Sequence, residues 1–206
     1  LKQGNIKSST GKKTATKLWN AFKFSLTNLE GFNPSAIYKE NKIHIDKNEL
    51  EIMDKWMLSN LMRTIKLSTE GFENSEYSKS RLETDLLFWQ KLCDNYLELI
   101  KHRTYGDHLQ QESKEKAQKT LYYTLLSIIK LYAPIMPFIT EETYQLYFKK
   151  FEGKESIHIA SWPEHNSNLI DEEAEEIGNL AVQIITEIRK YKSTKQVSIK
   201  SEIEEI

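Results

Sequence analysis

The chain carries a run of basic and aromatic residues near its N-terminus, and their types and spacing suit contact with a nucleic acid. Residues 1–29 contain six lysines and no acidic residue, although the whole chain has a formal net charge of only -1. Lysine ammonium groups meet phosphates or base edges, and an aromatic ring among them can stack on an unpaired base. The lysines of this first candidate site are Lys2, Lys7, Lys12, Lys13, Lys17 and Lys23.

An α-helix through the second half of this segment would sort its residues onto two opposite faces. At about 100° per residue, the bulky apolar side chains share one arc and form a core face: Leu18, Trp19, Phe22, Leu26 and Leu29. The opposite arc holds Lys13, Lys17, Asn20 and Phe24. This pattern favours a nucleotide platform, in which the ring stacks on a base while the lysines and the amide contact phosphates or base edges. In the alternative interpretation, Phe24 packs against a neighbouring loop and the lysines are only solvated.

A second basic cluster lies near the C-terminus and comprises Arg189, Lys190, Lys192, Lys195 and Lys200. Cations favour the negative end of the helix dipole, so a solvated helix end explains this cluster as well as an RNA contact does. The candidate contacts to an RNA backbone are Lys12 and Lys23 from the first segment and Arg189, Lys190 and Lys192 from the second.

Residues arranged for catalysis or metal binding are not found in the sequence. It has no glycine-rich dinucleotide loop, no Walker loop and no Gly-x-Ser-x-Gly elbow. The five histidines include no pair at ligand spacing, so we expect no metal site. The single cysteine, Cys93, falls on the apolar stripe of a predicted helix, which favours a packed thiol over a nucleophile. We therefore predict no catalytic residue and no cofactor within this chain.

Composition indicates one sizeable domain, since 39% of the residues are hydrophobic and can form a core. A single cysteine fits a reducing compartment, and we expect the cytoplasm. No run of about 18 apolar residues predicts a membrane span. The first residues do not form a signal peptide, because no apolar core follows the basic start. Because the chain opens without methionine and closes at Glu204-Glu205-Ile206 without a clear stop, we expect a piece of a longer protein.

The elements that would position these residues are helices. Only 7 glycines and 4 prolines interrupt the chain, and the intervals between them have helical spacing, which predicts an all-α antiparallel helix bundle. We expect helices over about 14–29, from Asp46 (with Glu49 as its capping-box partner) to about residue 65, over about 76–105, over 111–132 and over about 170–198.

Two of these helices have an apolar stripe that should face the core. On the third, the predicted buried residues are Leu82, Leu86, Trp89, Cys93, Tyr96 and Ile100. On the last, they are Ile177, Leu180, Ala181, Ile184, Ile188 and Tyr191. With these stripes assigned to the core, no apolar seam of heptad spacing is left for a protein partner, so a purely structural scaffold without an RNA role is the more distant alternative.

Six motifs, in order along the chain, resemble those of the anticodon-binding domain of valyl-tRNA synthetases. Residues 17–24 read K-L-W-N-A-F-K-F, similar to the family's K-L-W-N-A-x-R-F, and residues 54–61 read D-K-W-M-L-S-N-L, similar to D-R-W-I-L-S-R-L. The others are C-D-N-Y-L-E-L at 93–99, P-I-M-P-F-I-T-E-E at 134–142, S-I at 156–157 followed by W-P at 162–163, and I-R-K-Y-K-S at 188–193. The proline-rich and W-P elements are shared with isoleucyl and leucyl relatives, whereas the first and last motifs favour valine.

The resemblance implies an antiparallel bundle of the class I aminoacyl-tRNA synthetase anticodon-binding type. The parent enzyme attaches valine to its tRNA using ATP and Mg, but its H-I-G-H and K-M-S-K-S motifs are not found here, so this part alone should be inactive. In the family, the first lysine and the last phenylalanine of the opening motif touch anticodon bases, which implies Lys17 and Phe24. We expect a monomer that binds valine tRNA through the anticodon loop.

Some positions depart from the family pattern. Lys23, Lys55 and Asn60 stand where arginine is usual, and lysine lacks the planar fork of arginine, which puts a contact at Lys23 in doubt. The nearer alternative is the same module of an isoleucyl-type synthetase. We expect one domain over 1–206, with its core at about 11–165 and a C-terminal helix at about 170–198 that leads toward a further region.

Overall fold

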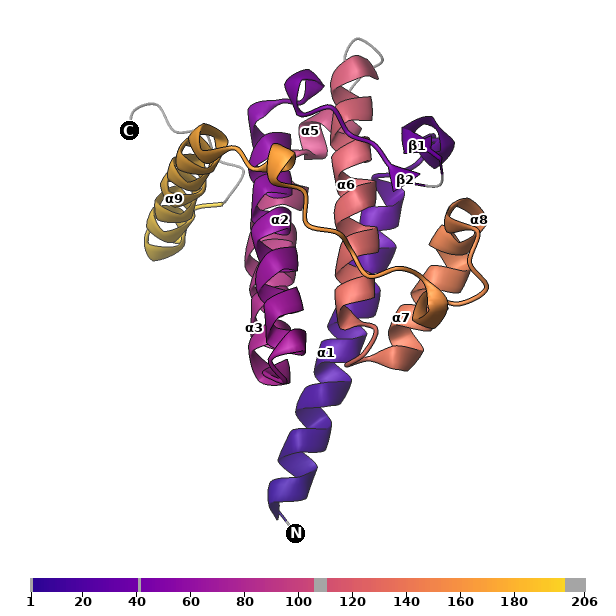
Figure 1. The fold of residues 1–206 in the computed structure, drawn as a ribbon. Coiled ribbons are helices and arrows are strands. Elements are labelled where there is room, and N and C mark those ends of the chain that lie inside the picture. The colour runs from indigo at the N-terminus through magenta and orange to yellow at the C-terminus, as the bar shows by residue number, and fades with distance from the viewer. Residues whose placement is uncertain (1, 41, 106–110, 199–206) are drawn as a thin grey trace.

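The computed structural model describes the backbone of residues 2–40, 42–105 and 111–198, and within these ranges the side chains from residue 15 onward. The long helices run beside one another, and successive ones point in opposite directions (Figure 1). They are α1 (Lys2–Thr27), α2 (Ile52–Glu73), α3 (Tyr77–Leu86) with its π-helical continuation η3 (Leu87–Tyr96), and α6 (Gln111–Tyr132). The predicted all-α antiparallel bundle is confirmed.

Shorter elements connect and flank the long helices. A two-residue antiparallel ribbon pairs Tyr38 with Ile43, and α9 (Glu172–Thr194) lies against the outer side of α2 (Figure 1). The others are η1 (Pro34–Ile37), β1 (Tyr38–Lys39), β2 (Lys42–Ile43), η2 (Lys47–Glu49), α4 (Leu97–Leu99), α5 (Lys101–Thr104), α7 (Pro137–Thr143), η5 (Tyr144–Phe148), α8 (Lys149–Glu152), η6 (Ile157–Ile159) and η7 (Ser167–Leu169).

The predicted start of the second long helix at Asp46 is wrong. The carboxylate of Asp46 accepts a hydrogen bond of 2.9 Å from the backbone nitrogen of Asn48, so it caps the short 3₁₀ helix η2. The chain then becomes extended at Leu50 and Glu51, and α2 begins at Ile52. The capping signal was real, but it belonged to a single turn that precedes the helix.

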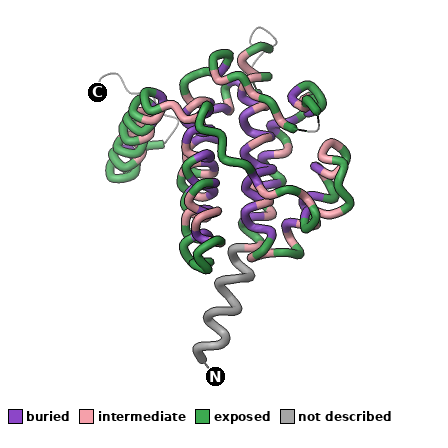
Figure 2. The backbone as a smooth tube through the Cα atoms, viewed as in Figure 1, coloured by how far each residue is buried: buried purple, intermediate pink, exposed green. Residues whose placement is uncertain are grey.

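Buried side chains line the inward sides of the long helices (Figure 2). The apolar face predicted for α1 is confirmed at Leu18, Phe22 and Leu29, which are 1–2% exposed, while Trp19 and Leu26 are partly buried against the same core. The rings of Phe22 and Phe88 stack with their centroids 6.0 Å apart, which joins α1 to η3. Burial of these large side chains is the main force that holds α1 on the bundle.

The stripe predicted for the third helix is wrong in its first half. Leu82 and Leu86 are 55% and 37% exposed, and the buried positions of α3 are Ser80 and Thr84. A Cβ on Gly71 of α2 would lie 3.1 Å from the Ser80 backbone nitrogen, so the two helices touch almost backbone to backbone. Small residues allow this approach, and the leucines are turned to solvent as a result.

The stripe predicted for the last helix is also wrong. Ile177, Leu180, Ile184 and Tyr191 are 44–60% exposed, whereas Ala174 and Gly178 are the residues buried against α2. The exposed side chains follow heptad spacing, so the expectation that the chain has no exposed apolar seam is wrong as well. The cause is a close contact, because a Cβ at Gly178 would lie 2.2 Å from Trp56 Cδ1.

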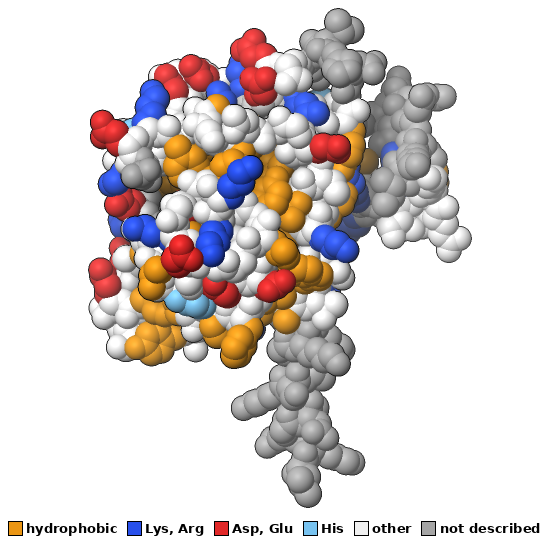
Figure 3. Space-filling model, turned by 90° about the vertical axis from the view of Figure 1, so that its right-hand side faces the viewer, with side chains coloured by type: hydrophobic (Ala, Val, Ile, Leu, Met, Phe, Trp, Pro, Cys, Tyr) orange, Lys and Arg blue, Asp and Glu red, His pale blue; other side chains and the backbone are white. Residues whose placement is uncertain are grey.

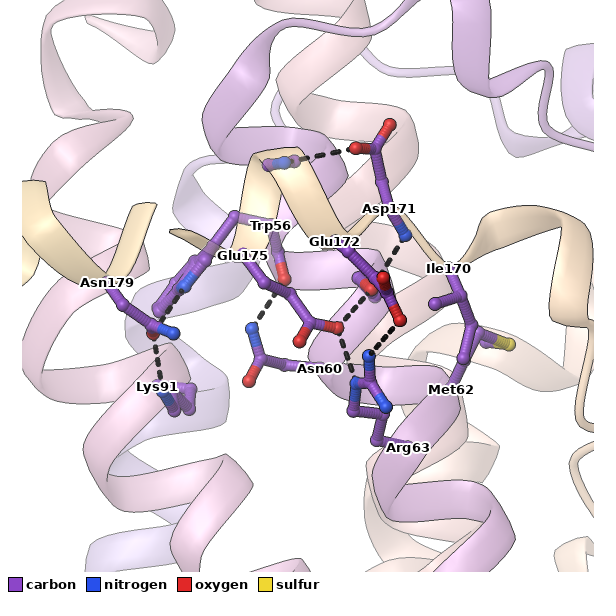
Figure 4. Close-up of polar contacts among 12 residues, drawn as sticks. Trp56, Asn60, Met62, Arg63, Lys91, Ile170, Asp171, Glu172, Glu175 and Asn179 are labelled. Atoms are coloured by element: carbon purple, nitrogen blue, oxygen red, sulfur yellow. Dashed lines mark hydrogen bonds and ion pairs between the residues drawn. The ribbon is translucent and has the colours of Figure 1, made fainter. Parts of the chain in front are cut away.

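Polar groups orient α9 on α2 where apolar burial is small (Figure 4). Glu175 accepts a hydrogen bond of 2.6 Å from Arg63 Nε and another from the Ser59 hydroxyl. One turn further along, Asn179 Oδ1 accepts from Trp56 Nε1 at 3.0 Å and from Lys91 Nζ at 3.1 Å. These bonds set the register of α9, because each pairs a particular residue of α9 with one of α2 or η3.

Candidate nucleic-acid interface

The helical wheel of α1 is correct for the residues whose side chains the structure describes. Lys17, Asn20 and Phe24 are exposed on one side, opposite the buried Leu18 and Phe22. Phe24 is 39% exposed, which is unusual for a ring in a helix that is otherwise packed. Lys23 is also exposed, on a different side of the helix. The side chains of Lys12 and Lys13 lie outside the described part of the chain.

Two of these side chains are in contact with the neighbouring segment of the bundle. The Lys17 ammonium lies 5.5 Å from the ring centroid of Trp89 in η3, and the Lys101 ammonium of α5 lies 5.4 Å from the ring centroid of Phe24. Cations over aromatic faces are attracted to the ring quadrupole. The Phe24 ring is therefore partly covered, as the packing alternative predicted, and partly open, as the platform interpretation requires.

The end of α1 is bound to α5 through a chain of hydrogen bonds that converge on Phe24. The Phe24 carbonyl accepts from the Thr27 hydroxyl at 2.6 Å and from the Asn28 amide at 3.1 Å. Thr27 in turn is 3.0 Å from the Tyr105 hydroxyl, and the Thr104 hydroxyl donates to Asn28 Oδ1 at 2.8 Å. Because the proton of Thr27 is already used, the Tyr105 hydroxyl is the donor in that contact.

A buried ion pair anchors α5 on the opposite side. Arg103 is 3% exposed and makes two hydrogen bonds, of 2.9 and 2.7 Å, to the carboxylate of the fully buried Asp54. The Tyr96 hydroxyl donates to the same carboxylate at 2.6 Å, and burial raises the pKa of Tyr96 well above its usual value, with the neighbouring Asp54 adding to the effect. Tyr96 therefore remains a neutral donor, and α5 is held rigidly beside α1.

The second basic cluster does not form one open patch. Arg189 donates to the backbone carbonyl of Asp94 at 3.0 Å, Lys190 lies 3.5 Å from Glu187, and Lys192 is only 9% exposed. The sequence could not show this, because the register of α9 on α2 decides which of these cations are turned inward. The RNA-backbone contacts suggested for Arg189, Lys190 and Lys192 stay predictions.

Sequence reasoning missed Trp89, Lys101 and Tyr105 as neighbours of the α1 face. Trp89 was assigned to the core and is instead partly exposed beside Lys17. Tyr105, at the end of the short helix α5, is 58% exposed. A pattern of one aromatic and two basic residues at 101–105 was the available signal, but its position relative to α1 depends on the tertiary fold.

The side of the molecule with α7 and α8 presents a different surface. Hydrophobic side chains gather there in patches among charges of both signs (Figure 3), and the exposed apolar residues of α7, η5 and η6 include Phe138, Leu146 and Ile159. Acidic and basic side chains are both spread over this side, so a polyanion would meet repulsive as well as attractive charges (Figure 3). The surface therefore suits RNA less well than the α1 face does.

The described residues form no cluster of metal ligands, and the protonation of the single thiol follows from its burial. No three histidine, cysteine or acidic side chains are grouped there to hold a metal ion. Burial raises the pKa of the Cys93 thiol to about 12, so it stays protonated and fits the packed thiol predicted from the sequence. None of the helices in the described ranges is long and apolar enough to cross a membrane.

The family of this helical bundle is identified by comparison with known proteins. Residues 54–206 match the family model for the anticodon-binding domain of tRNA ligases, and the chain belongs to that family. Within it, the chain is similar to valine–tRNA ligases. It is 40% identical over 190 residues to that of Pyrococcus furiosus and 36% identical over 194 residues to that of Ehrlichia ruminantium.

The similarity covers nearly all of this chain but only part of each relative. The match to the Pyrococcus furiosus protein spans 92% of the chain and 20% of the relative, and the match to the Ehrlichia ruminantium protein spans 94% and 22%. The valine–tRNA ligase of Thermococcus kodakarensis is 37% identical over a similar span. The chain therefore corresponds to about a fifth of the length of these relatives.

Proposed function

We propose that this chain recognises the anticodon loop of valine tRNA through the exposed face of α1 formed by Lys17, Asn20 and Phe24. The observation that carries the proposal is the partly exposed Phe24 ring, which lies on the same side of the helix as the exposed Lys17 and the amide of Asn20. An unpaired base can stack on such a ring while its edge meets the polar groups beside it. Membership of the anticodon-binding family, which is shown by residues 54–206, supports RNA recognition by this chain.

The names of the relatives support a proposal of valine tRNA rather than isoleucine tRNA. The similar proteins from archaea and bacteria are named as valine–tRNA ligases, with identities of 35–40%. The opening motif, K-L-W-N-A at 17–21, includes Lys17 and Asn20 of the α1 face. We therefore propose that Lys17 reads a base edge and that Asn20 adds a donor and an acceptor within the same loop.

The attachment of valine belongs, on this proposal, to the parts of the longer relatives that this chain does not cover. ATP and Mg would bind there, and the present chain would contribute tRNA binding alone. We propose that it acts as a monomer in the cytoplasm. The purified chain should show no valine-dependent pyrophosphate exchange above a heat-inactivated control, and measurable exchange would contradict this division of labour.

The proposal is tested by titrating the chain with three RNA hairpins that share one stem. The first carries the valine anticodon, the second the isoleucine anticodon and the third a shuffled anticodon. We expect the valine hairpin to bind most tightly and its affinity to fall between roughly 50 and 200 mM salt, because phosphate contacts release counterions. Equal binding of all three hairpins would contradict anticodon recognition.

Lys17→Ala separates the two kinds of lysine contact. If the ammonium reads a base edge, the variant should lose affinity for the valine hairpin and discriminate less between hairpins. If it contacts a phosphate, the loss should be uniform and the salt slope should fall by about 1. Lys66→Ala is a matched control, because Lys66 is an exposed lysine of α2 outside the α1 face.

A further inference from the structure

We propose that α5 extends the nucleotide-binding surface beyond α1. Tyr105 provides a second ring on which an adjacent unpaired base stacks, and Lys101 contacts the phosphate that joins the two stacked nucleotides. The inference rests on the proposed function, since it assigns further residues to the same RNA site. It does not follow from the opening motif, which lies entirely within α1.

The geometry brings these residues to one place. The Lys101 ammonium lies over the Phe24 ring at 5.4 Å, and the Tyr105 hydroxyl is bound to Thr27, which is three residues beyond Phe24 on the same helix. Lys101 and Tyr105 are four residues apart, a spacing that makes side chains of a helix neighbours. The Lys101 ammonium therefore lies over one ring, and the second ring is anchored at its hydroxyl about one turn further along α1.

Both rings have open area for a ligand. Tyr105 is 58% exposed and Phe24 is 39% exposed. Contact between an apolar ring and water is unfavourable, and a base that stacks on the ring removes part of its area from solvent. Stacking is also tolerant of base identity, because every base has a π-face. Two neighbouring rings thus suit consecutive unpaired nucleotides of a loop.

The charge of Lys101 is balanced in the absence of RNA. Its ammonium lies 2.6 Å from the carboxylate of Glu98, and both side chains are more than 40% exposed. Exposed ion pairs of this kind are worth little, so a phosphate can compete with Glu98 for the ammonium. Glu98 thereby weakens RNA binding, and removal of its charge should strengthen it.

The surface is held in place before RNA arrives. Thr104 is bound to Asn28, the first residue after α1, and Tyr105 is bound to Thr27, the last residue of α1. Arg103 of α5 is anchored on the buried Asp54. Residues that are already ordered lose little conformational entropy on binding. The buried pair is therefore a positioning device for Lys101 and Tyr105, which themselves contact the ligand.

The test uses the full 206-residue chain and the valine anticodon hairpin, with Kd measured for five variants. Tyr105→Ala and Phe24→Ala should each weaken binding about five- to 100-fold, as expected for the loss of one stacking platform. Tyr105→Phe keeps the ring and should bind within about twofold of the unmodified chain. Lys101→Ala should lower the salt slope by about 1. Glu98→Gln should tighten binding and leave the melting temperature nearly unchanged.

The outcomes distinguish this inference from the function on which it rests. If Phe24→Ala weakens binding and Tyr105→Ala does not, anticodon recognition stands and the extension to α5 is overturned. If neither substitution matters, both proposals fail. Equal losses in Tyr105→Phe and Tyr105→Ala would show that the hydroxyl bond to Thr27 is what counts, which also overturns the stacking role. Thermal melts of each variant identify any loss that is due to unfolding.

Discussion

The guanidinium of Arg103 and the carboxylate of Asp54 form a two-pronged ion pair that is buried between α5 and α2, with bonds of 2.9 and 2.7 Å. The Tyr96 hydroxyl also donates to Asp54, and Arg103 also donates to the hydroxyl and the carbonyl of Ser113. Charges this deeply buried are tolerated only when they are paired and hydrogen-bonded. The ion pair therefore holds α5 next to the α1 face, although α5 itself is a helix of only four residues.

Arg103→Met should destabilise the chain by about 3–5 kcal/mol, because it leaves the buried carboxylate of Asp54 without its countercharge. Urea denaturation measures the loss. The matched control is Arg81→Met, since Arg81 is exposed and its contact with Asp85 spans 3.4 Å, and it should change the free energy of unfolding by less than about 1 kcal/mol. Adding Asp54→Asn to Arg103→Met should recover part of the loss, and a double variant less stable than Arg103→Met alone would contradict this account.

Phe24→Ala and Phe22→Ala should separate RNA binding from folding. Phe22 is 1% exposed, so its truncation should cost about 3–5 kcal/mol of stability. Phe24 is 39% exposed and has the Lys101 ammonium 5.4 Å from its ring centroid, so its truncation should cost about 1 kcal/mol or less. Among folded molecules, Phe24→Ala should lose more affinity for the valine hairpin than Phe22→Ala. A strongly destabilised Phe24→Ala with unchanged affinity would show that the ring is a core residue.

Helix positions and the buried face of α1 could be predicted because large apolar side chains repeat there at helical spacing. The same rule failed on α3 and α9, where the contact faces are made of small residues such as Ser80 and Gly178. A hydrophobic pattern identifies residues that gain from burial, but it does not detect backbones that approach closely. On both helices the leucines and isoleucines were therefore assigned to the wrong side.

The candidate site was predictable in part for a related reason. Lys17, Asn20 and Phe24 lie on one helix, so their common face follows from helical periodicity alone. Lys101 and Tyr105 join them only through tertiary packing of a short helix that has no periodic pattern of its own. The π-helical stretch η3 also shifts the register of Trp89, which no local signal in the sequence reveals.

Gly178→Ala provides a test of the close contact between α9 and α2. In an exposed helix this substitution would stabilise by about 1 kcal/mol. Here the new Cβ would lie 2.2 Å from Trp56, so we expect a loss of about 1–3 kcal/mol or release of α9 from α2. Urea denaturation and hydrogen exchange of α9 measure these effects. Gln183→Ala, at an exposed position of the same helix, is the control, and a stabilised Gly178→Ala would contradict the contact.

Asp171 should make the docking of α9 depend on pH. A hydrogen bond of 3.0 Å from the backbone nitrogen of Ala174 lowers the pKa of Asp171, partial burial opposes this, and the nearby Lys47 ammonium adds to the lowering. A depressed pKa in the folded state means that the ionised group stabilises the fold above its unfolded pKa of about 3.9. This contribution is lost as the pH falls through the folded value.

Asp171→Asn keeps a side-chain acceptor for the cap and removes the charge, so it isolates the electrostatic part. At pH 7 it should be less stable than the unmodified chain by about 0.3–1 kcal/mol, the usual range for a charge at a helix N-terminus. The difference should shrink as the pH is lowered toward 3, because Asp171 itself becomes protonated. Asp171→Ala loses the acceptor as well as the charge, so it should be less stable than Asp171→Asn by about 1 kcal/mol at every pH. Urea denaturation at pH 7, 5 and 3 gives the three curves, and an Asp171→Asn difference that stays constant with pH would exclude the charge as its cause.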